Sequence, residues 1–290
     1  MTLGTVAAFV ASVTWAFATT RYARASREVG STRVNLARTF TALPAFAILR
    51  VVFGEGPLFA GFTTERALWL LASIVCSYAV ADSLFLAACR RVGITTGLSI
   101  ASTYPLWAAI WGTVVDGEAF GTERAAGTLL AVGGVIWLVR LGTRGESARE
   151  RDGVGLGLAV LVSVLWALNS IGVKRGATGI GLFDVNVFRF SAALLILAPQ
   201  LRLPSERGRA RAPTGGWVTL VPALLADCTL GSLAYVYGLS HTDLAVGATL
   251  SSLAPLISVP FAVAAGEERF DVRRLAAIVT TVLGVALLVR

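Results

Sequence analysis

Residues 12–16 read Ser-Val-Thr-Trp-Ala, and residues 163–167 read Ser-Val-Leu-Trp-Ala, 151 positions further along the chain. The same shift places Arg38 on Arg189. A shift smaller by one residue pairs the later part of each half: Pro105 with Pro255, Glu118 with Glu268, Phe120 with Phe270, Arg124 with Arg274 and Gly134 with Gly284. One register that serves almost the whole chain indicates two homologous halves, residues 1–145 and residues 146–290.

The composition places this duplicated chain in a membrane. Hydrophobic residues make up 56% of the 290 positions and charged residues only 14%, whereas about 25% of the residues in a soluble domain are charged. The net charge of +8 comes mainly from arginines in short segments between apolar runs, where they set topology and contact lipid headgroups. No recognition motif accompanies this charge, so we expect no nucleic-acid partner.

Ten apolar stretches are long enough to cross a bilayer, which takes roughly 20 residues per helix. Their predicted bounds are 3–21, 31–52, 66–89, 93–115, 122–141, 153–174, 182–201, 214–239, 243–265 and 271–289. Polar breaks separate most of them, among them a break from Arg21 to Arg33. The first stretch has no basic segment before it and no small-residue cleavage pattern after it, so we expect a span rather than a removable signal peptide.

Each half then holds five spans. Five is an odd number, so the second half enters the membrane from the side opposite to the first. Inverted repeats of this kind are typical of secondary transporters, whose binding site forms near the membrane midplane between the halves. The alternative is a duplicated scaffold that transports nothing.

Paired residues in both halves resemble a known family. The shared marks are Trp15-Ala16 and Trp166-Ala167, Arg38 and Arg189, Pro105 and Pro255, Glu118 and Glu268, and Gly134 and Gly284. In these marks the chain resembles the drug/metabolite transporter superfamily, in particular its ten-span EamA-like exporters, over residues 3–289. The resemblance implies an all-α integral membrane fold of ten helices in two inverted five-helix repeats. It also implies transport of a metabolite, without identifying which one.

Catalytic and cofactor signatures are missing from the sequence. It contains no zinc-protease, P-loop or nucleophile-elbow motif and only one histidine. We therefore expect no enzymatic activity, no metal site and no cofactor. The three cysteines, Cys76, Cys89 and Cys228, lie in apolar runs and are expected to be buried and free.

Four charged residues lie well inside predicted spans, away from their ends, where a charge is expensive and marks a site or a pairing partner. Two of them, Arg38 and Arg189, lie near the starts of the second and seventh spans. One interpretation is that they snorkel to the interface or cap carbonyl groups of a neighbouring helix. The other is that they provide a fixed positive charge at the vestibule of the site, which attracts an anionic group.

The other two, Asp82 and Asp227, lie deeper, in the third and eighth spans, and outside the family marks. Helical spacing places Tyr78 on the face of Asp82, and Tyr235 on the face of Asp227. Two interpretations stay open at this stage. The carboxylates bind a proton or a substrate ammonium group, or they form a structural salt bridge, for example from Arg38 to Asp82.

Two tryptophans, Trp15 and Trp166, lie in the middle of their spans, away from the interfaces where tryptophan usually gathers. An indole N–H needs an acceptor there, so we predict that both side chains line a central cavity rather than face lipid. Asn169 adds a polar group beside Trp166.

Hydroxyl groups precede the prolines of the fourth and ninth spans. Ser102 and Tyr104 come before Pro105, and Ser252 comes before Pro255. Because a proline frees a backbone carbonyl one turn earlier and a hydroxyl can satisfy it, such helices bend and suit a gate. Attachment of one helix to another is the alternative. We include these three hydroxyl residues among the candidate substrate-binding residues.

The sequence therefore favours a secondary transporter in the cell (inner) membrane that exports a small, polar, amino-acid-like metabolite by alternating access. Its expected partners are the lipid bilayer and the substrate, with protons as a candidate coupling ion, and we expect a monomer. A membrane-integral enzyme, a lipid flippase and a non-transporting scaffold are the alternatives. The side that carries both termini holds six Lys and Arg residues and the opposite side seventeen. The positive-inside rule then places both termini outside.

Overall fold

The computed structural model describes residues 2–92, 97, 100–119, 121–141, 152–202, 210–254, 256–257 and 272–288. These residues form helices and connecting segments, with no strand among them. The first half contains α1 (Leu3–Val29), α2 (Ser31–Phe53), α3 (Thr64–Ile74), the π-helical segment η1 (Val75–Ala79), α4 (Ala81–Val92), α6 (Tyr104–Asp116) and α7 (Thr122–Leu141). The second half contains α8 (Gly153–Ala177), α9 (Leu182–Leu197), η2 (Ala198–Arg202), η4 (Trp217–Leu220), α10 (Val221–Leu224), the π-helical segment η5 (Leu225–Gly231), α11 (Ser232–Ser240), α12 (Leu244–Ser251) and α14 (Val272–Leu288).

Five helical stretches among the described residues are long and apolar enough to cross a membrane: Ser31–Phe53, Thr64–Cys89, Gly153–Ala177, Leu182–Arg202 and Trp217–Ser240. Shorter apolar helices cover Leu3–Ala18 and Leu275–Leu287. Large apolar side chains are exposed on their outer surfaces, including Val51, Leu195 and Val218. A surface with this many exposed apolar side chains is stable in contact with lipid rather than with water. The chain is a multi-pass, all-α membrane protein, as predicted.

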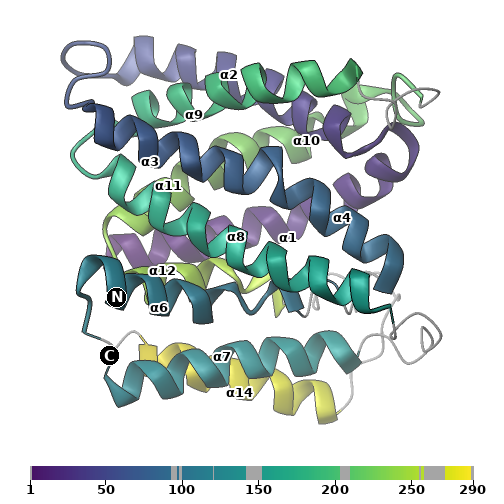
Figure 1. Cartoon of the computed structure of the whole chain (residues 1–290), viewed down its shortest axis with the longest axis vertical. Helices are drawn as coiled ribbons and strands as arrows, with labels where there is room; N and C mark the ends of the chain where they lie inside the picture. Colours follow the sequence, from purple (N-terminus) through teal and green to yellow (C-terminus); the bar gives the residue numbers. More distant parts are fainter. Residues whose placement is uncertain are drawn as a thin grey trace.

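The helices run side by side, and α1 begins at the same end of the bundle at which α14 finishes (Figure 1). We call this the terminus end. The opposite end, where α1 passes to α2, is the arginine-rich end. The second half starts there, because α8 begins beside the end of α4, and Arg91 and Asp152 form an ion pair of 3.4 Å across that junction. The two five-helix repeats are therefore inverted relative to each other.

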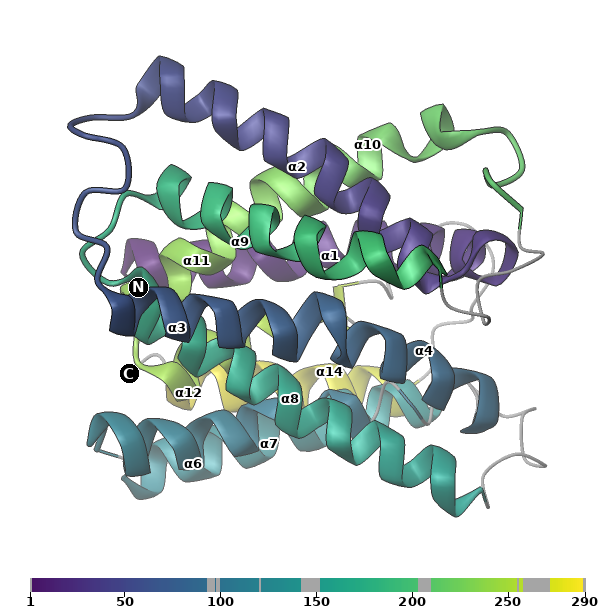
Figure 2. The ribbon, with the colours of Figure 1, turned by 45° about the horizontal axis from the view of Figure 1, so that its top comes forward.

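Contacts between helices follow the two-fold relation of the halves. The mates α2 and α9 pack on each other, and so do the mates α7 and α14. In Figure 1 these pairs lie at opposite margins of the bundle, and in Figure 2 α2 lies along the top while α7 lies in the lower part. Between the margins, α1 packs against α11 and α12, while its mate α8 packs against α3, α4 and α6. The contacts of α1 with η5 and α11 thus recur, with the halves exchanged, as the contacts of α8 with η1 and α4.

Glycines allow the close packing of α7 on α14. A Cβ atom on Gly134 would collide with Thr281, and one on its mate Gly284 would collide with the backbone of Ala131. Small residues at such points let helix backbones approach within a membrane, where dispersion and packing rather than the hydrophobic effect hold helices together. The paired glycines noted in the sequence therefore have a packing role.

The first helix is longer than predicted. The sequence places its end at residue 21, but α1 continues to Val29, and Gly30 alone joins it to α2. No glycine or proline interrupts the helix before that point, and alanine and arginine favour helix in this stretch. Gly30 has a φ of 88°, a conformation that glycine adopts without strain. The predicted break from Arg21 to Arg33 is therefore wrong.

The third and eighth spans each contain a π-helical segment that the sequence did not reveal. These segments, η1 and η5, occupy equivalent positions in the two repeats. In a π-helical turn the backbone N–H bonds to the carbonyl five residues earlier, as Val80 does to Val75 at 3.2 Å. Such turns are rare and gather at functional sites. They widen the helix where it borders the centre of the molecule.

The fourth and ninth spans are interrupted at equivalent positions. The helix breaks at Ser102 and Thr103 and starts again as α6 with Pro105 in its first turn. The corresponding break in the ninth span falls at Ser252 and Leu253. Interrupted helices of this kind frame the binding site in many transporters. The related predictions for Pro255 and Glu268 lie outside the described residues.

Candidate substrate cavity

A cavity of about 240 Å³ lies between the two repeats. All twelve candidate residues selected from the sequence line it: Trp15, Arg38, Tyr78, Asp82, Ser102, Tyr104, Trp166, Asn169, Arg189, Asp227, Tyr235 and Ser252. These residues come from spans 1, 3, 4, 6, 8 and 9, and from the second and seventh spans through Arg38 and Arg189. Whether these residues bind a substrate stays a prediction.

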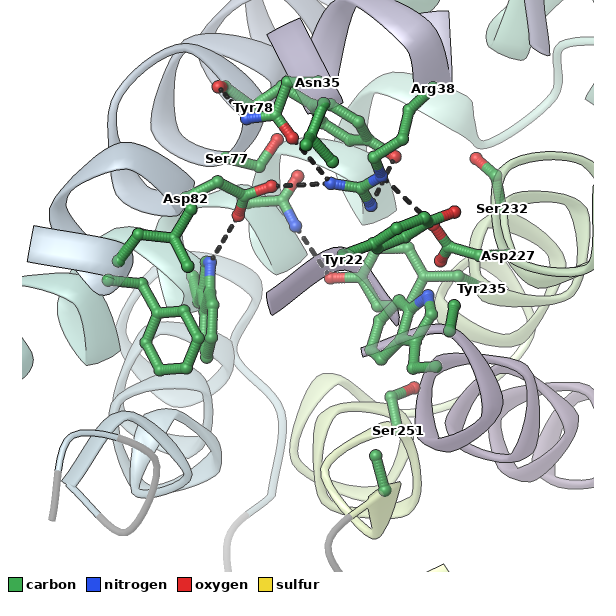
Figure 3. Close-up of a pocket in the computed structure, with 18 of the residues that line it drawn as sticks. Tyr22, Asn35, Arg38, Ser77, Tyr78, Asp82, Asp227, Ser232, Tyr235 and Ser251 are labelled. Atoms are coloured by element: carbon green, nitrogen blue, oxygen red, sulfur yellow. Dashed lines mark hydrogen bonds and ion pairs between the residues drawn. The ribbon is translucent and has the colours of Figure 1, made fainter. Parts of the chain in front are cut away.

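Arg38 of α2 lies between the two carboxylates (Figure 3). Its Nη1 donates to Asp82 Oδ2 at 2.8 Å, and its Nε donates to Asp227 Oδ2 at 3.1 Å. Nη1 also donates to Asn35 Oδ1, and Nη2 donates to the Tyr78 hydroxyl, both at 3.1 Å. The salt bridge proposed from sequence is therefore present, and it includes both aspartates rather than one.

Arg38, Asp82 and Asp227, which we call the Arg38 cluster, carry more negative than positive charge. One guanidinium faces two carboxylates, so the formal charge of Arg38, Asp82 and Asp227 together is negative. The ring of Tyr78 also lies 4.3 Å from the guanidinium carbon, a cation–π contact that holds the Arg38 side chain in place. The second oxygen of Asp82 accepts the indole N–H of Trp166 at 3.3 Å. This cluster is a negatively charged part of the cavity wall.

Arg189 of α9 has a different environment. Its side chain is only 3% exposed. Nε donates to the Ser73 hydroxyl at 3.2 Å, and Nη2 donates to Asn169 Oδ1 at 3.1 Å. Both acceptors are neutral, and no carboxylate among the described residues pairs with this guanidinium. Arg189 is therefore a positively charged part of the same cavity.

Aromatic rings form much of the remaining wall. Tyr235 accepts a hydrogen bond from Asn169 Nδ2 at 2.9 Å, and its ring lies 5.1 Å from that of Trp15. Trp166 contacts Phe85 at 5.3 Å and Tyr104 at 6.1 Å between ring centroids. The cavity thus combines two charged regions with apolar walls, a composition typical of sites for small ligands.

Several lining residues were not among the candidates: Tyr22, Ser26, Asn35, Ser77, Phe85, Ser232 and Ser251. Tyr22 was missed because the sequence placed it in a loop, whereas α1 carries it along the cavity. Ser77 and Ser232 are the repeat positions opposite Asp227 and Asp82, so the repeat register was the signal that could have found them.

The cavity extends toward one end of the bundle. In α1 its lining runs from Trp15 to Ser26, and in α2 it runs from Val34 to Arg38. Both stretches lie in the half of each helix nearer the arginine-rich end. Toward the terminus end the space is filled by a buried cluster that includes Ala11, Leu70, Ala108, Ile171 and Leu239.

Ion pairs gather at the closed terminus end. Arg50 pairs with Asp184 and Arg175 with Asp116, each at 2.6 Å, and Lys174 pairs with Glu118 and Arg124 with Asp243. Glu118 also accepts the backbone N–H of Leu244, at the start of α12, on both of its oxygens at 2.9 Å. Helices of both repeats are joined by these bonds, so they hold this end together.

Within the part of the chain that the structure describes, no group of three or more His, Cys, Asp or Glu side chains gathers as a metal site. The three cysteines form no disulfide with one another. Cys89 and Cys228 are buried, as predicted, whereas Cys76 is only half-buried, so the prediction of burial is wrong there.

Comparison with known proteins agrees with this description. The profile of the EamA-like transporter family matches the chain twice, at residues 2–140 and 153–290. An uncharacterized transporter of Archaeoglobus fulgidus is 26% identical over 158 residues, and this match spans 54% of the chain and 54% of that relative. The match therefore spans about half the length of the relative. A solved protein structure with 20% sequence identity has a TM-score of 0.79, covering 98% of this chain and 94% of its own. That likeness is one of fold alone.

Proposed function

The chain belongs to the EamA-like transporter family, and from that premise we propose that it is a secondary transporter that exports a small, amino-acid-like metabolite by alternating access. The observation that carries the substrate class is the presence of two opposite charges in one apolar cavity. The Arg38 cluster supplies excess negative charge, and Arg189 supplies positive charge. A zwitterion with a small apolar body complements both.

The position of the cavity supports the direction of transport. Its lining approaches the arginine-rich end, while the terminus end is filled and joined by ion pairs. If the positive-inside rule assigns the arginine-rich end to the cytoplasm, the structure corresponds to a state that takes up solute from inside the cell. Transport then requires the ion pairs at the terminus end to separate.

Coupling to protons follows from the charge of the Arg38 cluster. Two carboxylates share one guanidinium, so the cluster can accept one further cation, either a proton or a substrate ammonium group. Competition between the two is the basis of exchange, because a site occupied by one excludes the other. Exchange of a proton for the solute makes export depend on the proton gradient.

Transport assays with purified protein in liposomes test this function. Liposomes loaded with radiolabelled amino acids should release them faster with the protein than without it, and an imposed proton gradient should change the rate. The matched control is Asp82→Asn, which leaves Arg38 its second partner, Asp227, and should reduce release with little loss of stability. No release of any amino acid under either gradient would refute the proposed substrate class.

The orientation is tested separately by reporter fusions. A reporter at Arg290 should be active outside the cytoplasm, and one at Arg207 should be active inside it. The reverse pattern would contradict both the predicted topology and the assignment of the structure to a state that faces the cytoplasm.

A further inference from the structure

We propose that Arg189 is the residue that binds the anionic group of the substrate, and that this group is a monocarboxylate. The proposal rests on the proposed function and deepens it, because it divides the site between its two arginines. The sequence treats Arg38 and Arg189 as equivalent, since they are repeat mates. Their surroundings in the structure are not equivalent.

Arg38 has little remaining capacity for a substrate anion. Four of its five N–H groups donate to protein oxygens, and two of those oxygens belong to the carboxylates of Asp82 and Asp227. An incoming carboxylate would meet two negative charges around that guanidinium. Repulsion at such short range excludes an anion from this part of the cavity.

Arg189 has such capacity. It uses Nε and Nη2 on neutral acceptors, Ser73 and Asn169, and no described residue accepts a hydrogen bond from Nη1. A buried guanidinium without a counter-charge is costly, and proteins retain one where a partner arrives with the ligand. The side chain lines the cavity, so a ligand can supply that partner.

The planar guanidinium and the size of the cavity select the ligand. Arginine binds carboxylates through two parallel N–H donors, with a geometric specificity that lysine lacks. A cavity of about 240 Å³ holds a small solute. With the carboxylate on Arg189, the apolar body lies among Trp15, Trp166 and Tyr235, and the ammonium group reaches the Arg38 cluster.

The first experiment needs no knowledge of the natural substrate. The thermal stability of the purified protein is measured in sodium propionate and in sodium chloride at equal ionic strength. A monocarboxylate that pairs with Arg189 stabilises the folded state by mass action, so the wild type should gain about 2–4 °C in propionate at about five times Kd. Arg189→Gln should lose this gain, and Arg189→Lys, which keeps the charge but not the paired donors, should keep only part of it.

A second variant keeps the test decisive if Arg189→Gln folds poorly. Asn169 Oδ1 already accepts from Arg189, so Asn169→Asp places a resident carboxylate against the guanidinium. This variant should be at least as stable as the wild type and should not respond to propionate. A response to propionate in Arg189→Gln or in Asn169→Asp that equals the response of the wild type would overturn the proposal.

The second experiment connects the anion site to the substrate. Binding of leucine and of isopentylamine, which has no carboxylate, is followed by the intrinsic fluorescence of the protein, because neither ligand absorbs in that range. Arg189→Gln should weaken leucine binding by about 10–100-fold and leave isopentylamine binding unchanged. If Arg189→Gln weakened the binding of both ligands equally, the role of Arg189 would be structural only. If the wild type binds propionate but neither transports nor binds any amino acid, the proposed function fails while the anion site stands.

Discussion

The two repeats share their helices, their π-helical segments and their interrupted spans, but they differ around the paired arginines. In the first repeat Arg38 meets a carboxylate from each half, Asp82 and Asp227. In the second repeat the partners of Arg189 among the described residues are hydroxyl and amide oxygens. The fold is therefore symmetric, and the charge inside it is not.

The repeat register explains how this difference arises. The position equivalent to Asp82 in the second repeat is Ser232, and the position equivalent to Asp227 in the first is Ser77. Each repeat thus has one carboxylate and one serine at these positions, and both carboxylates pair with the same arginine. A symmetric scaffold becomes a cavity with a negative and a positive region, so the proposed zwitterionic substrate would bind there in one orientation.

The largest expected effect concerns stability. Removal of Arg38 by Arg38→Gln leaves the half-buried Asp82 and the buried Asp227 without a counter-charge and should destabilise the protein by about 3–5 kcal/mol. Arg189→Gln removes only a charge that has no acidic partner, together with two hydrogen bonds, and should cost about 1–2 kcal/mol. Thermal unfolding in detergent compares the two variants.

A rescue variant separates charge from packing in this comparison. Arg38→Gln combined with Asp82→Asn and Asp227→Asn carries no buried charge in the cluster and should recover most of the lost stability. If the triple variant is no more stable than Arg38→Gln alone, the cluster stabilises the protein through packing rather than charge. Equal losses in Arg38→Gln and Arg189→Gln would remove the asymmetry altogether.

The second prediction concerns the region in which the repeats are alike. Gly134→Ala and Gly284→Ala each force α7 and α14 apart and should each destabilise the protein by about 1–3 kcal/mol. Gly133 faces open space, because no atom lies within 4 Å of a Cβ placed there. Gly133→Ala is therefore the matched control and should be neutral. If Gly134→Ala and Gly284→Ala lose different amounts of stability in thermal unfolding, the interface between α7 and α14 is less symmetric than its contacts indicate.

The third prediction concerns the two ends of the bundle. Glu118→Gln removes the charge that pairs with Lys174, so it should favour opening of the terminus end by up to about tenfold, or about 1.4 kcal/mol. Opening is measured by maleimide labelling of a cysteine introduced at the buried Ile171, in protein whose native cysteines have been replaced. Arg91→Gln, which breaks the exposed pair at the arginine-rich end, is the control. Faster labelling in Arg91→Gln than in Glu118→Gln would contradict the assignment of the closed end.

Much of the fold could be predicted from the sequence, because each span is decided locally. Apart from the end of the first helix, the described span bounds agree with prediction to within three residues. The length of α1 was missed because hydropathy marks where a helix leaves the lipid, not where it stops being helical. The π-helical segments were missed because their hydrogen-bond pattern depends on tertiary packing, which periodicity does not record.

The candidate site was predicted less completely. Charged and aromatic residues inside spans were conspicuous, because each is unfavourable in lipid without a partner, and all of the selected residues line one cavity. The sequence could not decide which partner each one has. Arg38 and Arg189 are equivalent by register, and only the three-dimensional arrangement shows that both aspartates gather around the first of them.

The smallest expected effect compares the paired tryptophans. Trp166 donates its indole N–H to Asp82 at 3.3 Å and so orients the carboxylate within the Arg38 cluster. Trp15 packs its ring against Tyr235. Trp166→Phe should therefore weaken the binding of isopentylamine by about 2–10-fold, equivalent to the loss of one hydrogen bond of about 0.5–1.5 kcal/mol. Trp15→Phe retains a ring against Tyr235 and should have a smaller effect. Calorimetric titration of the two variants measures the difference. A larger loss in Trp15→Phe would show that the ammonium group depends on the aromatic wall more than on the negatively charged cluster, and the assignment of the two ends of the substrate would then reverse.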